Sequence, residues 1–126
     1  MHFHLLTIFP EFFASPLLVS LIKKAQDKGL VSCTVHNLRD YATGAHKSTD
    51  DSPYGGGQGM VMKPEPIVNA LEQICAPLVN PWRILLSPQG IPLSQEKVHT
   101  LATQETLVLV CGRYEGVDER DRKSVV

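Results

Sequence analysis

The sequence has 126 residues, of which 43% are hydrophobic and 20% charged, and its formal net charge is −1. This length fits one domain, which can bury roughly two-thirds of its unfolded surface. The near-neutral charge excludes a global attraction to nucleic acid or anionic membranes, so any RNA contact must come from a local patch. No apolar run reaches the roughly 18 residues of a membrane span, and no basic secretory signal begins the chain.

The three cysteines, Cys33, Cys75 and Cys111, lie far apart in apolar runs. None has the Cys-x-x-Cys or Cys/His spacing of a zinc site, and their odd number does not suit a disulfide framework. This pattern favours buried, reduced thiols. Together with the absence of targeting signals, it predicts a soluble, cytoplasmic protein.

In the first part of the chain, residues 3–9 are mostly apolar and β-prone, which predicts a buried strand of a parallel sheet. His2 and His4 are interpreted as strand-end or lightly buried histidines rather than ligands. Residues 30–38 predict a second strand. Between the strands, a helix is predicted from Pro16, with Ser15 as its cap, to a glycine at position 29. Its spacing predicts one buried face, formed by Leu17, Leu18, Leu21, Ile22 and Ala25.

The second part of the chain alternates helices and strands. A helix is predicted just after two prolines at positions 64 and 66, a strand over 83–86 and a strand over 106–111. Another helix is expected from Ser94, its cap. This alternation predicts an α/β fold with a mainly parallel sheet flanked by helices. The inward residues are expected to be Ile67, Val68, Leu71, Ile74 and Cys75 in the first of these helices and Val98, Leu101 and Ala102 in the second.

Residues 43–66 contain five of the nine glycines, together with the polar residues His46, Lys47 and Asp50. Glycine permits positive φ and a close approach of backbone to a ligand. Loops longer than about 12–15 residues are uncommon unless they are functional or disordered. A flexible linker is the alternative, but the apolar residues near Tyr54 and Met60 argue against it.

Two predicted strands end in glycine-containing turns, at residues 86–90 and 112–116. In open parallel sheets, ligands bind outside the carboxyl ends of strands. Backbone donors and acceptors there suit the edge of a purine, whose faces need apolar contacts. Each turn alone is also compatible with an ordinary strand-to-helix connection. No dinucleotide-binding G-x-G-x-x-G motif is present, and the missing lysine disfavours a P-loop-like nucleotide binder.

Four segments carry a family resemblance. They are His-Asn-Leu-Arg-Asp-Tyr at 36–41, Asp-Asp-Ser-Pro-Tyr-Gly-Gly-Gly-Gln-Gly-Met at 50–60, Leu-Ser-Pro-Gln-Gly at 86–90 and Cys-Gly-Arg-Tyr-Glu-Gly-Val-Asp-Glu-Arg at 111–120. In this order they resemble the bacterial tRNA (guanine-N-1)-methyltransferases, a family of the SPOUT superfamily of trefoil-knotted enzymes. The resemblance implies a homodimer that transfers a methyl group from S-adenosylmethionine to N-1 of the guanine 3′ of the tRNA anticodon.

The resemblance also implies roles for individual residues. For the cofactor, the implied contacts are Leu86, Ser87 and Pro88 in one loop and Gly112, Tyr114, Glu115 and Gly116 in a second. For the target guanine and its neighbours, they are His46, Asp50, Gly59 and Glu115.

The sequence departs from the family pattern after Arg120. We therefore expect 1–126 to be a single N-terminal cofactor-binding domain, with an incomplete knot and little methyl transfer alone. The general base is expected in a C-terminal helical domain outside these residues, and no catalytic residue is assigned here. The alternative from another functional class is a non-catalytic dimerisation or RNA-binding module.

Overall fold

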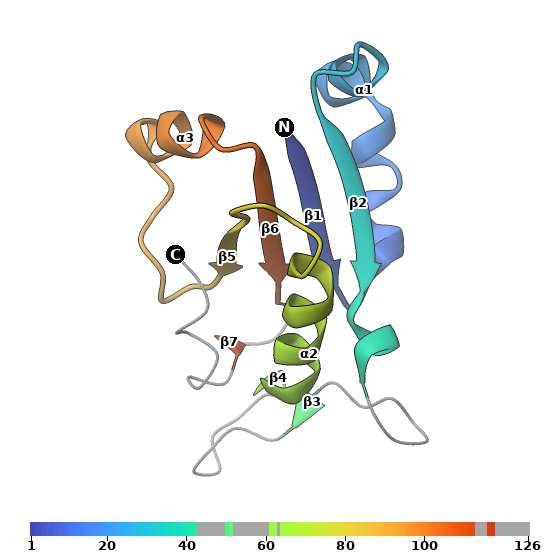
Figure 1. The fold of residues 1–126 in the computed structure, drawn as a ribbon, viewed down its shortest axis with the longest axis vertical. Coiled ribbons are helices and arrows are strands. Elements are labelled where there is room, and N and C mark those ends of the chain that lie inside the picture. Colours follow the sequence, from blue (N-terminus) through green and yellow to red (C-terminus); the bar gives the residue numbers. More distant parts are fainter. Residues whose placement is uncertain (43–49, 52–60, 63, 113–115, 118–126) are drawn as a thin grey trace.

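A computed structural model describes residues 1–42, 50–51, 61–62, 64–112 and 116–117 of the chain (Figure 1). Its main sheet has four strands, which are all parallel and lie in the order β2-β1-β6-β5. This arrangement confirms the predicted parallel α/β sheet. The strand bounds are β1 (His2–Thr7), β2 (Ser32–Asn37), β5 (Trp82–Leu86) and β6 (Thr106–Cys111).

Helices lie on both sides of this sheet. Figure 1 shows α1 behind β2 and α2 in front of the sheet. The helix bounds are α1 (Ser20–Asp27), α2 (Pro64–Cys75) and α3 (Gln95–Ala102), with short 3-10 helices η1 (Pro10–Phe13), η2 (Pro16–Leu18) and η3 (Leu38–Tyr41).

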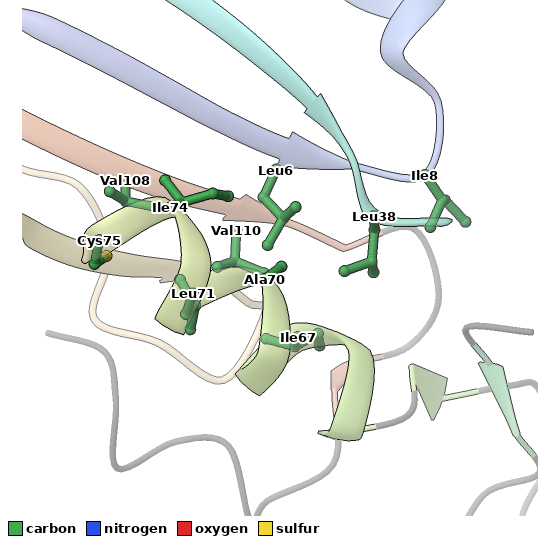
Figure 2. Close-up of a cluster of buried hydrophobic side chains, with 10 residues drawn as sticks. All are labelled: Leu6, Ile8, Leu38, Ile67, Ala70, Leu71, Ile74, Cys75, Val108 and Val110. Atoms are coloured by element: carbon green, nitrogen blue, oxygen red, sulfur yellow. The ribbon is translucent and has the colours of Figure 1, made fainter. Parts of the chain in front are cut away.

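The hydrophobic core lies between α2 and the face of the sheet that it covers (Figure 2). Alternate residues of a strand point to the same face, so Leu6 of β1 and Val108 and Val110 of β6 meet the helix together. The inward spacing predicted for α2 is confirmed except at Val68, which is 39% exposed. The helical side of the core consists of Ile67, Ala70, Leu71, Ile74 and Cys75, with Ile8 and Leu38 closing its end.

The predicted helix from Pro16 to position 29 is wrong in its first part. Val19 is extended, with φ −130° and ψ 156°, and separates η2 from α1. Ser15 makes no side-chain cap, because it already has helical backbone angles rather than the extended ones of a capping residue. The predicted end is confirmed, since Gly29 takes φ +72° just after α1.

The buried face predicted for this segment is also wrong. No residue of η2 or α1 is buried, and Leu18 and Leu21 are 65% and 76% exposed. The spacing is that of an amphipathic helix, but the described residues cover its apolar side only in part, since Leu17 and Ala25 are half-buried. Val98 and Ala102 of α3 were likewise expected inward, and both are exposed.

The three thiols differ in burial. Cys75 is buried, whereas Cys33 and Cys111 are half-buried, so the prediction of burial is confirmed only for Cys75. All three are free cysteines. Among the residues that the structure describes, no helix has both the length and the hydrophobicity that crossing a bilayer requires.

Candidate functional site

The two turns highlighted by the sequence follow neighbouring strands. β5 pairs with β6 in parallel, and the last residues of the two strands, Leu86 and Cys111, are register partners. Ser87 and Gly112 are the next residues of the two strands, so their main-chain atoms lie side by side at the carboxyl edge. The structure therefore confirms that the 86–90 turn and the start of the 112–116 turn share one edge of the sheet.

The first turn is held by two local hydrogen bonds. The amide of Gly90 donates to the carbonyl oxygen of Ser87 at 3.1 Å, and the amide of Gln89 donates to Ser87 Oγ, also at 3.1 Å. A Cβ added to Gly90 would lie 3.3 Å from the carbonyl oxygen of Ser87, closer than an ordinary van der Waals contact. The turn therefore needs glycine for its tight course, and it exposes Pro88 and Gln89.

A cavity of about 910 Å³ opens beside this turn. Its floor is the sheet face opposite α2, and one wall is α3, whose first turn is fixed because Ser94 Oγ accepts the amide of Lys97 at 3.1 Å. Lys97 carries the only charged side chain among the described residues that line the cavity. The lining comprises Met1, Phe3, Ile84 to Leu93, Lys97, Val98, Leu101, Ala102, Leu107 and Leu109.

Such a cavity suits a flat, mostly apolar ligand with one polar edge, because its floor is apolar and its rim offers main-chain groups. Its volume is within the roughly 300–1,000 Å³ typical of small-molecule sites. Cys111 stays protonated near neutral pH, since burial raises the pKa of its thiol. The residues of α3 that line the cavity were not among the predicted site residues. The sequence did indicate them, because Val98, Leu101 and Ala102 were predicted to face inward.

A second, smaller sheet connects two of the predicted site residues. β3 (Asp50–Asp51) pairs antiparallel with β4 (Val61–Met62), and β4 pairs in parallel with β7 (Gly116–Val117). Asp50 and Gly116 therefore lie on strands that flank β4. Figure 1 shows this sheet beyond the carboxyl ends of the main strands. The backbone of the predicted substrate loop is thus joined to the end of the second predicted cofactor loop.

The predicted site residues are only partly described. Leu86, Ser87, Pro88 and Gly112 lie at the shared edge, and the backbones of Asp50 and Gly116 lie in the small sheet. Four further predicted residues, His46, Gly59, Tyr114 and Glu115, lie outside the described residues, as does the end of the chain on which the knot depends.

One contact at this edge was not anticipated from the sequence. Arg39 of η3 donates from Nη1 to the carbonyl oxygen of Ile8 at 2.7 Å, and its guanidinium lies 5.8 Å from the ring centroid of Phe9. The η3 helix itself starts from Asn37, whose Oδ1 accepts the amide of Arg39. These bonds fix the carboxyl ends of β1 and β2 to each other.

A parallel sheet in which a turn at the carboxyl edge lines an apolar cavity along one face is typical of a nucleotide- or nucleoside-binding α/β protein. The particular family follows from comparison with known proteins. The chain matches the family described as tRNA (Guanine-1)-methyltransferase TrmD over residues 1–126. The chain belongs to this family.

Similar proteins support this assignment. The chain is 52% identical over 125 residues to a tRNA (guanine-N(1)-)-methyltransferase of Syntrophotalea carbinolica, covering 99% of this chain and 51% of that protein. A relative from Synechococcus elongatus is 54% identical over 122 residues, covering 95% of this chain and 51% of that protein. The crystal structure of tRNA (m1G37) methyltransferase from Aquifex aeolicus superposes with a TM-score of 0.90 at 39% identity, covering 99% of this chain and 56% of that one. The chain spans about half the length of the curated relatives that it matches.

Proposed function

We propose that this chain is the cofactor-binding domain of a tRNA methyltransferase. The reaction is methyl transfer from S-adenosylmethionine to N-1 of the guanine 3′ of the anticodon. The observation that carries the proposal is the 86–90 turn, which lines an apolar cavity and lies beside the start of the 112–116 turn at the carboxyl edge of the sheet. The family match over the whole chain supports the choice of methyl transfer among nucleoside-binding functions.

The described residues fit the nucleoside part of this cofactor. The apolar floor, including Ile84 and Leu109, offers contacts for the faces of adenine, while main-chain groups of Ser87 and Gly112 suit its polar edge. Leu86 and Pro88 complete the first loop, and Tyr114, Glu115 and Gly116 are proposed for the second. When bound, S-adenosylmethionine supplies an electrophilic methyl group on a sulfonium.

The protein's own contribution is to position the reacting base and to accept its proton. Taking guanine out of its stack costs a few kcal/mol, which hydrogen bonds to its edge offset. We assign these bonds to His46, Asp50, Gly59 and Glu115. Joining of Asp50 to Gly116 through β4 supports a site in which substrate and cofactor loops act together. N-1 of guanine carries a proton, so a general base is required. We place it outside these 126 residues.

We also propose that the protein forms a homodimer and that its partner is tRNA. Its proposed location is the cytoplasm. Exposed apolar side chains on the consecutive elements η1, η2 and α1 support dimerisation, because burial against a second copy would remove them from water. We call this surface the apolar helix face; its residues are Phe12, Leu18, Val19, Leu21 and Ile22.

The experiment that tests this function is a methylation assay on an unmodified tRNA transcript. We expect a polypeptide of residues 1–126 to bind S-adenosylmethionine but to transfer little methyl. When the polypeptide is extended with the C-terminal half of a relative, it should methylate N-1 of the guanine 3′ of the anticodon. It should not methylate a transcript that has adenine at this position. Near-full turnover by residues 1–126 alone would refute the placement of the base. Absence of transfer by the extended protein would refute the activity.

The apolar helix face also favours one other function, a dimerisation module without catalysis. Cofactor titration by calorimetry separates the two functions. Heat of S-adenosylmethionine binding supports the methyltransferase domain, whereas no heat together with dimer-sized light scattering supports the association module.

A further inference from the structure

Two histidines from neighbouring strands meet on the sheet face that α2 partly covers. His36 of β2 is the register partner of Leu6 of β1, and His4 lies two residues before Leu6 on the same strand. Because alternate residues point to the same face, all three side chains share this face. His4 Nδ1 lies 2.9 Å from His36 Nε2. Both side chains are half-buried and remain accessible to solvent. Sequence spacing gave no sign of the pair, because the two residues are 32 positions apart.

The two rings are in direct contact through their nitrogens. Their planes differ by 24° and their centroids are 5.2 Å apart. The centroids are farther apart than His4 Nδ1 and His36 Nε2 by roughly the width of one imidazole ring. The two nitrogens therefore lie on the line between the ring centres, and the rings meet edge to edge. One nitrogen therefore donates a hydrogen to the other, and the lone pair of the acceptor points at the donor.

The nitrogen separation also matches the spacing of two adjacent ligands on a metal. Metal–nitrogen bonds of about 2.0–2.1 Å that meet at a right angle place their nitrogens about 2.9 Å apart, whereas a tetrahedral angle places them about 3.3 Å apart. Right angles between ligands are typical of nickel and copper ions. The 2.9 Å between His4 Nδ1 and His36 Nε2 is the length of their hydrogen bond, and it shows that the two nitrogens can come as close together as adjacent ligands of one ion.

The surroundings of the pair favour a metal. Tyr41 Oη lies 3.4 Å from His36 Nδ1, where it can accept the hydrogen when Nε2 binds metal. Thr34 lies directly opposite His4, and its exposed hydroxyl shares the face.

We propose that His4 and His36 form a binding site for a divalent transition-metal ion of the nickel or copper type. His4 Nδ1 and His36 Nε2 are the two protein ligands, and each ring turns so that both lone pairs point to one ion beside the pair. The shared hydrogen moves to the second nitrogen of its own ring, so no proton is lost. Among the described residues no group of three or more His, Cys, Asp or Glu side chains surrounds a metal position, so water completes the coordination.

The test isolates this pair from the other three of the five histidines in the chain. In the background H2N/H46N/H99N, only His4 and His36 remain as imidazoles, and chelation by His2 with the terminal amine is removed. Ni²⁺ is titrated by calorimetry in a non-chelating buffer. We expect one ion per chain, weakened about ten-fold or more by either H4N or H36N. Tyr41→Phe keeps both ligands and should weaken binding less than either ligand variant does.

A second readout does not depend on the stability of the variants. In the NMR spectrum of the unmodified protein, substoichiometric Ni²⁺ should broaden the ring signals of His4 and His36 together. Mg²⁺, which prefers oxygen ligands, should leave them unchanged. Equal Ni²⁺ affinity with and without His36, or broadening that spares the two rings, would overturn the proposal.

Discussion

At Gly90, the lack of room for a methyl group constrains the 86–90 turn, which is proposed as the first cofactor loop. An added Cβ would lie 3.3 Å from the carbonyl oxygen of Ser87, so this backbone would have to shift by a few tenths of an ångström. Because main-chain groups of the same turn are proposed to bind adenine, the shift should affect the cofactor more than the fold. Gly29 offers the opposite case, since it has φ +72° and open space around it.

We predict that Gly90→Ala weakens S-adenosylmethionine binding by roughly three- to ten-fold, equivalent to about 0.7–1.4 kcal/mol. Gly29→Ala should instead cost about 1 kcal/mol of stability, because the left-handed backbone disfavours a Cβ, and should leave cofactor binding unchanged. Calorimetry and urea unfolding of both variants check these outcomes. Equal cofactor affinity for Gly90→Ala and the unmodified chain would contradict the assigned role of this turn.

The pair His4 and His36 makes the stability of the fold depend on pH. Burial lowers the pKa of His4 and His36 below 6.5, and the positive charges of His2 and His4, respectively, lower them further. The unfolded chain therefore binds more protons than the folded one as pH falls through 6.5. Stability is fully present above that pH and decreases below it. The other titratable groups nearby are Tyr41, whose pKa is raised mainly by burial, and Asp40, which adds to that shift.

We predict that the urea midpoint falls as pH is lowered from about 7.5 to about 5, with a chelator present. The variant H4Q/H36Q should flatten this dependence. His99→Gln, at an exposed position in α3, should retain it. An unchanged pH slope in the double variant would show that other groups cause the dependence.

Among the structural elements, α2 has the clearest division between a buried and an exposed side. Ile67 is 1% exposed and packs in the core, whereas the adjacent Val68 is 39% exposed. We predict that Ile67→Ala costs about 2–5 kcal/mol of stability, because it leaves a cavity between helix and sheet. Val68→Ala should cost less than about 1 kcal/mol. Chemical unfolding measures both, and similar costs would contradict the packing of α2 against the sheet.

Elements with strong periodicity were predictable from the sequence. The strand expected over 106–111 has those bounds, and the buried side of α2 followed from its spacing. The break at Val19 was not predictable, because a single extended residue leaves the helical spacing of its neighbours intact. Spacing also cannot show whether an apolar side packs on the protein's own sheet or on another molecule, which is why α1 was assigned a buried face.

The candidate site was predictable to a similar extent. Ser87 and Gly112 were expected together because parallel strands end at one edge. The link from Asp50 to Gly116 was missed, since strands of two residues, such as β3 and β7, carry no periodic signal. The His4–His36 pair was missed because it depends on strand register, which the sequence does not specify.

For the whole molecule, the apolar helix face predicts self-association. Leu21 is 76% exposed on this face, and Val79, 79% exposed, lies elsewhere between α2 and β5. We predict that Leu21→Glu converts a dimer to a monomer, because burying a charge in an apolar interface is unfavourable. Val79→Glu, with the same chemistry and exposure, should leave the dimer intact. Sedimentation equilibrium distinguishes these outcomes, and a Leu21→Glu dimer would exclude this face as the interface.

We propose above all that a methyl-donor nucleoside binds where β5 and β6 end side by side. Backbone amide NMR during titration with S-adenosylhomocysteine, the product form of the donor, tests it most directly. We expect the largest shifts at Gln89, Gly90 and Gly112, with smaller ones at Leu109 on the cavity floor. Shifts confined to α1 and β2, or none at saturating ligand, would contradict it.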